Sequence, residues 1–138
     1  LVWQLCGVAL KQLAKDLGVQ EQVYFLGYRT DIKELLAAAD IFLFTTLQEG
    51  MPRSMMEAMA AGLPCIASKI RGNVDLIENG KGGFLCVPTD SDAFAQAIRL
   101  CTYDVRKKFG RENLIAIQQY DIHVVEEEIR KIYKEVFQ

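Results

Sequence analysis

The sequence contains little that would support metal or disulfide chemistry. It has one histidine in 138 residues, and its four cysteines, Cys6, Cys65, Cys86 and Cys101, lie far apart with no C-x-x-C spacing. A structural zinc site needs about four Cys or His ligands, with characteristic short spacings between them. We therefore expect no metal site. Cys65 and Cys86 lie in apolar runs, where reduced cysteine packs as a small hydrophobic residue, and reduced thiols favour a cytoplasmic protein.

A strong charge of either sign and long apolar runs are also missing. The formal net charge is -2, so nothing in the composition favours nucleic acid as a partner. No apolar run approaches the roughly 18 residues that a membrane-spanning helix needs. A hydrophobic content of 51% over 138 residues is enough for one domain with a core. We expect a single domain over residues 1–138, and we interpret the leucine at position 1 as the mark of a fragment.

What the chain does have is an alternation of apolar runs and amphipathic segments. Residues 8–17 and a segment that buries Ile32, Leu35 and Leu36 have helical spacing, and the unbroken run 41–45 is typical of a central parallel strand covered on both faces. The predicted strands are residues 1–6 (or the remnant of one), 23–26, 41–45, 65–67 and 84–87. The alternation predicts an α/β fold with an open, mostly parallel sheet flanked by helices. Three further helices follow, of which 104–119 has Gly110 as a weak point.

Two glutamates, Glu49 and Glu57, follow the apolar run 41–44. Pro52 lies between them and suits the first turn of a helix. A helix start after a buried parallel strand can hold phosphates on free backbone N–H groups, and neighbouring carboxylates can accept hydrogen bonds from sugar hydroxyls. The combination suits a nucleotide-sugar. The alternative is that both glutamates complement the helix dipole and stay solvated.

Blocks of sequence around these glutamates occur in an order and spacing specific to one family. They are residues 23–27, 31–36, 39–42, 49–52, 57–64 and 75–80. Together they resemble the retaining GT-B glycosyltransferases, most closely glycosyltransferase family 4, and the glutamate pair resembles the family's E-x7-E motif. The resemblance runs from about residue 23 to about residue 100. It implies a Rossmann-like domain that forms the C-terminal, donor-binding half of a GT-B fold.

The resemblance also implies roles for single residues. Glu57 matches the glutamate that binds the ribose diol, and Glu49 matches the one beside the donor hexose, which makes Glu49 the catalytic candidate. The other donor contacts it implies are the loop Gly50, Met51 and Pro52, the N–H groups of Ser54 and Met55, and the base-pocket loop Gly27, Tyr28 and Arg29, which acts mostly through backbone atoms. Two alternatives stay open: Tyr28 is equally well read as a surface aromatic residue, and Arg29 is better placed to pair with Asp31.

The full-length protein is expected to transfer a hexose from a UDP- or GDP-linked sugar to a glycan or lipid-linked acceptor, without metal or cofactor. The setting implied is bacterial polysaccharide biosynthesis. An N-terminal acceptor domain, and the first strand–helix unit with its phosphate-clamping arginine and lysine, would lie upstream of Leu1. The fragment alone would then be inactive, since transfer needs both substrates positioned together.

Alternatives to this function are a non-catalytic nucleotide-binding module and a GT-B nucleotide-sugar epimerase. The basic cluster Arg106, Lys107, Lys108 and Arg111 is best explained as solvated. Peripheral contact with the inner face of the membrane is the minority interpretation of that cluster.

Overall fold

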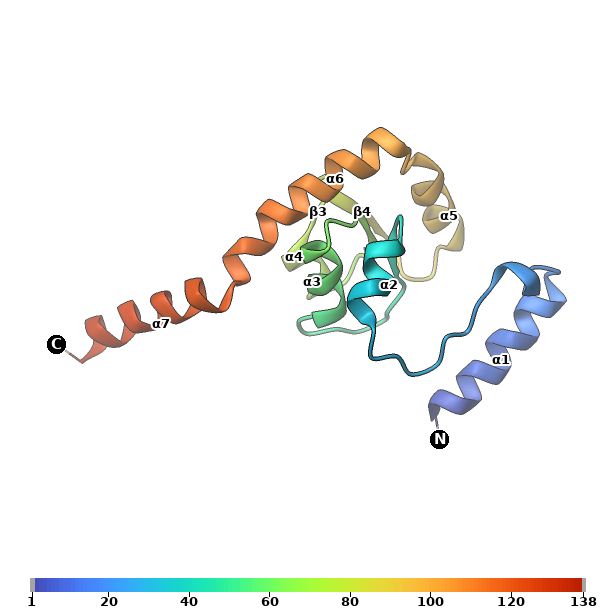
Figure 1. Ribbon diagram of the computed structural model, residues 1–138, viewed down its shortest axis with the longest axis horizontal. Coiled ribbons are helices and arrows are strands. Elements are labelled where there is room, and N and C mark those ends of the chain that lie inside the picture. The colour runs from blue at the N-terminus through green and yellow to red at the C-terminus, as the bar shows by residue number, and fades with distance from the viewer. Residues whose placement is uncertain (1, 138) are drawn as a thin grey trace. The chain divides into compact units, whose positions relative to one another are not determined.

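The computed structural model describes residues 2–137, with side chains from residue 7 onward. The chain forms two compact units, Leu1–Ile32 and Lys33–Gln138. They are coloured from blue to cyan and from cyan to red in Figure 1. All of the strands among the described residues belong to the second unit.

The first unit is helical, and two predicted strands are absent from it. Residues 2–6 belong to α1, Val2–Asp16, so the strand predicted over 1–6 is wrong for that stretch, and Leu1 lies outside the described residues. A short apolar run next to a helical stripe simply extended the helix. After the 3-10 turn η1, Gln20–Gln22, residues 23–26 run as exposed coil rather than as a buried strand. A strand needs a neighbour to bond its backbone, and the described part of this unit offers none.

The second unit is built on a four-stranded sheet. The strands are β1, Phe42–Phe44; β2, Cys65–Ser68; β3, Glu78–Asn79; and β4, Gly82–Cys86, in the order β1-β2-β4-β3. β1, β2 and β4 run parallel. The predicted α/β fold with an open parallel sheet is confirmed.

One position in the sheet was predicted wrongly. β1 lies at the edge of the described sheet and β2 is internal, although the bulky run 41–45 is typical of a central strand. Leu43 of β1 is 47% exposed, whereas the four residues of β2 are buried. The hydrophobicity of a strand indicates whether its two faces are covered. It does not indicate whether another strand bonds to the backbone on each side, so the apolar run alone could not show that β1 is an edge strand.

Helices cover both faces of the sheet. From Ile32 onward the helices of the chain are α2, Ile32–Ala38; α3, Arg53–Ala60; α4, Asn73–Leu76; α5, Ser91–Leu100; α6, Tyr103–Ala116; and α7, Ile122–Val136, with the 3-10 turn η2, Ile117–Tyr120, between the last two. On one face, α3 buries Met55 and Met59 among residues of the sheet, and α6 lies beside α3 (Figure 1). On the other face, α5 buries Phe94 and Ala97. Of the residues that α2 was expected to bury, Leu35 and Leu36 are half-buried and Ile32 is exposed.

Two of the cysteines lie in the core, as the apolar runs around them indicated. Cys65 and Cys86 are buried, and burial raises the pKa of the Cys65 thiol to about 12. At the other extreme, α7 has no buried residue. In the described part of the chain, no helix combines the length and the apolar character that crossing a bilayer requires.

Candidate functional site

The predicted site lies where the parallel strands have their carboxyl ends, which we call the carboxyl edge of the sheet; the amino edge is where the same strands begin. Because β1, β2 and β4 are parallel, the loops that follow them, residues 45–52, 69–72 and 87–90, emerge at this same edge. Ligands of open α/β sheets bind outside the carboxyl ends of the strands. Gly72 in the second loop comes so close to the first that a Cβ there would lie 2.5 Å from the Gly50 carbonyl oxygen.

Glu49 is half-buried in the first of these loops. One carboxylate oxygen, Oε1, lies 3.3 Å from the hydroxyl of Thr46, which can donate to it. No other hydrogen bond or ion pair in residues 2–137 reaches this carboxylate, and an ionised carboxylate has about four acceptor positions. Most of its acceptor capacity therefore remains for a ligand. Sequence reasoning missed Thr46, although its position three residues before Glu49 was a signal for it.

Glu57 lies in the second turn of α3, with an exposed side chain. Like Glu49, it takes part in none of the ion pairs found in the described chain. The helix positions it firmly, since Met55 and Met59 on the opposite side are completely buried. The prediction that Glu57 lies on a helix after β1 is confirmed, with the correction that β1 is an edge strand.

The N-terminus of α3 offers free donors. Pro52, the N-cap residue, provides no side-chain hydrogen bond, and its carbonyl accepts the N–H groups of both Met55 and Met56 at 3.1 Å. The N–H groups of Arg53 and Ser54 have no partner within the described residues. The Met55 N–H is therefore occupied, and the free pair at this helix start is Arg53 and Ser54.

The loop before α3 is open to solvent on one side. A Cβ added at Gly50 would meet nothing within 4 Å, Met51 is 61% exposed, and Pro52 is buried. No packing within the second unit explains the missing side chain at Gly50. Within the second unit, the surface beside Glu49 is thus left uncovered.

Gly27, Tyr28 and Arg29 belong to the first unit, whereas the other predicted site residues belong to the second. Tyr28 is 93% exposed, as the surface alternative predicted. Arg29 pairs with Asp31, with its Nε 2.7 Å from Oδ1, which confirms that alternative. The guanidinium of Arg29 holds the pKa of Asp31 below its usual value.

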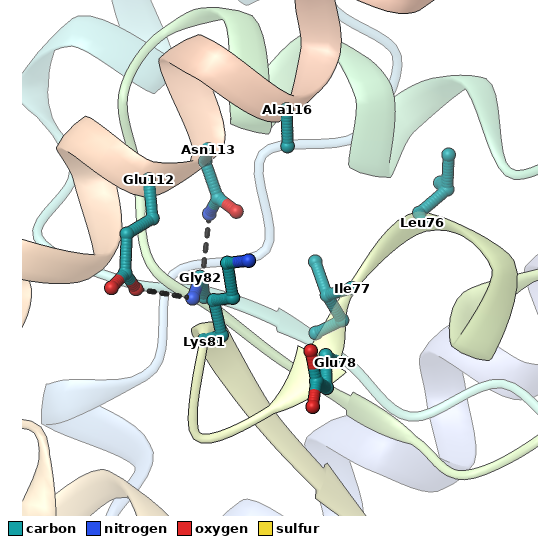
Figure 2. A pocket seen from close by; sticks show the side chains of 8 residues that line it. All are labelled: Leu76, Ile77, Glu78, Lys81, Gly82, Glu112, Asn113 and Ala116. Atoms are coloured by element: carbon teal, nitrogen blue, oxygen red, sulfur yellow. Dashed lines mark hydrogen bonds between the residues drawn. The ribbon is translucent and has the colours of Figure 1, made fainter.

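A different hollow lies at the opposite edge of the sheet, at the amino end of β4 (Figure 2). There Gly82 N–H donates to Glu112 at 2.8 Å, and Asn113 Nδ2 donates to the Gly82 and Leu63 carbonyls at 2.7 Å each. These polar groups bind one another, which indicates a structural role. Asn113 was not singled out from the sequence. Its position three residues after Gly110, on the same helical face, was the available signal.

The family model for glycosyl transferases group 1 matches residues 4–104. The chain belongs to this family. Among its relatives, an Escherichia coli UDP-Gal:alpha-D-GlcNAc-diphosphoundecaprenol alpha-1,3-galactosyltransferase is 42% identical over 89 residues, covering 64% of this chain and 23% of the relative. A Campylobacter jejuni N,N'-diacetylbacillosaminyl-diphospho-undecaprenol alpha-1,3-N-acetylgalactosaminyltransferase is 31% identical over 116 residues, covering 83% of this chain and 31% of the relative.

Solved structures share the fold of this chain. The crystal structure of Anabaena HepE in complex with UDP matches with a TM-score of 0.89 at 32% identity, covering 96% of this chain and 37% of that one. The complex of the same protein with UDP-glucose matches with a TM-score of 0.85. This chain spans about a quarter to a third of the length of the curated relatives named above.

Proposed function

We propose that this chain is the donor-binding part of a retaining, family 4 glycosyltransferase. The full-length protein would transfer a hexose from a nucleoside-diphosphate-sugar to a glycan or lipid-linked acceptor in bacterial polysaccharide biosynthesis. One observation carries the proposal: a carboxylate with free acceptor positions, Glu49, adjoins a helix start with unpartnered N–H groups at the carboxyl edge of a parallel sheet. The relatives that bind UDP and UDP-glucose favour UDP over GDP as the nucleotide.

Each group in the site has chemistry suited to one part of such a donor. The free N–H groups of Arg53 and Ser54, with the positive end of the α3 dipole, suit the diphosphate. Glu57, exposed and unpaired, can accept hydrogen bonds from both ribose hydroxyls, and charge-assisted bonds of this kind are stronger than neutral ones. Glu49 would stand beside the hexose, where its negative charge stabilises the positive charge that develops at the anomeric carbon.

We propose that the donor binds without a metal ion and that upstream parts of the protein supply the remaining positive charge for the diphosphate. An upstream arginine and lysine, implied by the resemblance, would have that role, and an N-terminal domain would hold the acceptor. A cytoplasmic protein with peripheral contact at the inner face of the membrane suits a lipid-linked acceptor. This location is consistent with relatives whose names specify diphosphoundecaprenol-linked acceptors.

The test is a donor screen on the full-length protein. Calorimetric titration with UDP, GDP and UMP comes first, and we expect UDP to bind more tightly than UMP because α3 contacts the second phosphate. Release of UDP from a panel of UDP-sugars, with and without lipid-linked glycan acceptors, then identifies the donor, and mass spectrometry and NMR of the product give the sugar and the anomeric configuration. Absence of nucleoside diphosphate binding, or a product with inverted configuration, would overturn the proposal.

A further inference from the structure

The loop that carries Glu49 rests directly on the loop after β2. Gly72 in that second loop is buried and has a φ of 87°, in the left-handed region that favours glycine. A Cβ at Gly72 would lie 2.5 Å from the carbonyl oxygen of Gly50 and 3.1 Å from that of Glu49. Real side chains do not approach backbone so closely, so any other residue at position 72 must push the Glu49 loop away.

Gly72 is itself tied to the internal strand of the sheet. The next residue, Asn73, is completely buried and donates its Nδ2 to the carbonyl oxygen of Ser68 at 2.8 Å. Ser68 is the last residue of β2, which is hydrogen-bonded on both sides. The position of Gly72 is therefore set by a strand that is buried and paired on both sides, and the Glu49 loop takes its position from Gly72.

Thr46, in the same loop as Glu49, also contacts the Glu49 carboxylate. The Thr46 hydroxyl lies 3.3 Å from Glu49 Oε1 and 3.2 Å from the Gln48 carbonyl oxygen, and Thr46 is half-buried. The hydroxyl has one proton, which it can share between these two acceptors. It thereby restricts the rotation of the carboxylate, while Gly72 sets the position of the backbone.

We propose that Gly72 and Thr46 are positioning residues for Glu49, an inference that rests on the proposed function. Glu57 does not depend on them, because it lies on α3 and that helix is anchored in the core by Met55 and Met59. Disturbing either positioning residue should therefore lower turnover and leave nucleotide binding intact. Misplacing a reacting group by about 1 Å can cost about 100-fold in rate.

The first experiment compares Gly72→Ala with Gly82→Ala in the full-length protein. Gly82 is a matched control because it is also buried, has a φ of 78°, and would place a Cβ 2.0 Å from Asn113 Oδ1 at the opposite edge of the sheet. The measurements are the urea midpoint, the Kd for UDP, and kcat for UDP release from the best UDP-sugar of the donor screen. We expect both variants to lose stability and only Gly72→Ala to lose kcat, by about 10- to 100-fold at unchanged Kd.

The second experiment compares Thr46→Val with Thr45→Val, an exposed neighbour, and uses Thr46→Ser as the rescue. Valine keeps the shape of threonine and removes the hydroxyl, so Thr46→Val should fold. We expect it to lower kcat by about tenfold, since a hydrogen bond to a charged group is lost, and Thr46→Ser to restore most of the rate. If Gly72→Ala does not fold, the comparison of Thr46→Val with Thr45→Val tests the positioning role by itself.

The outcomes separate this inference from the proposed function. If Gly82→Ala lowers kcat as much as Gly72→Ala, or if Thr45→Val matches Thr46→Val, the positioning role is wrong and the donor site stands. A Gly72→Ala variant whose Kd for UDP rises in step with its loss of kcat also overturns the inference. If the unmodified protein binds neither UDP nor GDP, the proposed function and the inference fall together.

Discussion

At the amino edge of the sheet, polar groups bind one another, whereas at the carboxyl edge several are left free. Around the start of β4, Glu112 and Asn113 satisfy the backbone of Gly82 (Figure 2), and Asn113 also donates to the Leu63 carbonyl. Around the end of β1, the first N–H groups of α3 have no partner in residues 2–137, and Glu49 keeps most of its acceptor capacity. The same fold therefore has one edge built for stability and one left open to a ligand.

The contrast shows where sequence changes should have separable effects. A buried polar network costs stability when it is broken, because each orphaned group keeps its full desolvation penalty. An exposed carboxylate with no partner contributes little to folding, so its removal should be felt only by the ligand. Variants at the two edges test this distinction.

The largest effect is expected from Asn113→Ala. Asn113 is 1% exposed, and its removal takes one hydrogen-bond donor away from each of two buried carbonyls, those of Leu63 and Gly82. Two lost hydrogen bonds and the cavity left by a buried side chain together cost about 3 kcal/mol, so we expect the free energy of unfolding to fall by about that amount, with the Kd for UDP unchanged. Urea unfolding measures the loss, and Gln118→Ala, at an exposed amide nearby, is the control. A loss below about 1 kcal/mol would show that this edge is not a stability element.

The amino edge also contains contacts that could not be predicted from the sequence, because they join residues far apart along the chain. Gly110 was predicted as a weak point of its helix. In the structure a Cβ there would lie 2.2 Å from the Gly62 carbonyl oxygen, so the glycine permits close packing of α6 against the turn after α3. Propensity describes a helix in isolation, and only the fold reveals which residue lies opposite. The same limit applies to Asn113, whose partners Gly82 and Leu63 lie 31 and 50 residues away in sequence. It applies also to Gly72, which lies about 22 residues from Gly50.

The parts that the sequence did predict depend on local signals. Pro52 indicated the start of α3, Asp90 caps α5 through the Ala93 N–H as expected, and the strand at residues 65–67 is part of β2. Strand pairing is non-local, which is why residues 23–26 were read as a strand although no strand in their own unit pairs with them. The roles of Glu49 and Glu57 came from a resemblance and remain predictions, which the following variants test.

Glu49→Gln should affect catalysis most among the variants at the carboxyl edge. Its charge would stabilise the transition state, and removing one such electrostatic group costs about 100-fold in kcat, or about 2.7 kcal/mol. Because the carboxylate adjoins the reacting sugar, we expect the Kd for UDP and the urea midpoint to change little. Steady-state kinetics with saturating acceptor are the measurement, and Gln48→Ala, at the exposed neighbour, is the control. If only KM rises, Glu49 binds the ground state and the catalytic assignment is wrong.

Glu57→Gln should instead weaken donor binding. Glu57 would contact the ribose, which does not react, so its contribution should be equal in the ground and transition states and appear as a raised KM with little change in kcat. Loss of a charge-assisted partner costs about 2 kcal/mol, a factor of about 30 in Kd. Glu78→Gln, an exposed glutamate at the amino edge, is the matched control and should leave Kd unchanged. Equal effects from both variants would remove the distinction between the edges.

The smallest effect is expected from Arg29→Met, at a residue of the predicted base-pocket loop whose side chain is already engaged. The Arg29 guanidinium lowers the pKa of Asp31, so the pair stabilises the fold above the ordinary aspartate pKa of about 3.9, and this contribution is lost as the pH falls through the lower, folded-state pKa. In the variant, we expect the Asp31 pKa to return towards its ordinary value, as followed by carboxyl carbon NMR shifts during an acid titration. The Kd for UDP should stay within about twofold, because the loop is expected to act through its backbone and an exposed ion pair contributes little. A clear loss of UDP affinity would instead mean that Arg29 exchanges Asp31 for a phosphate when the donor binds.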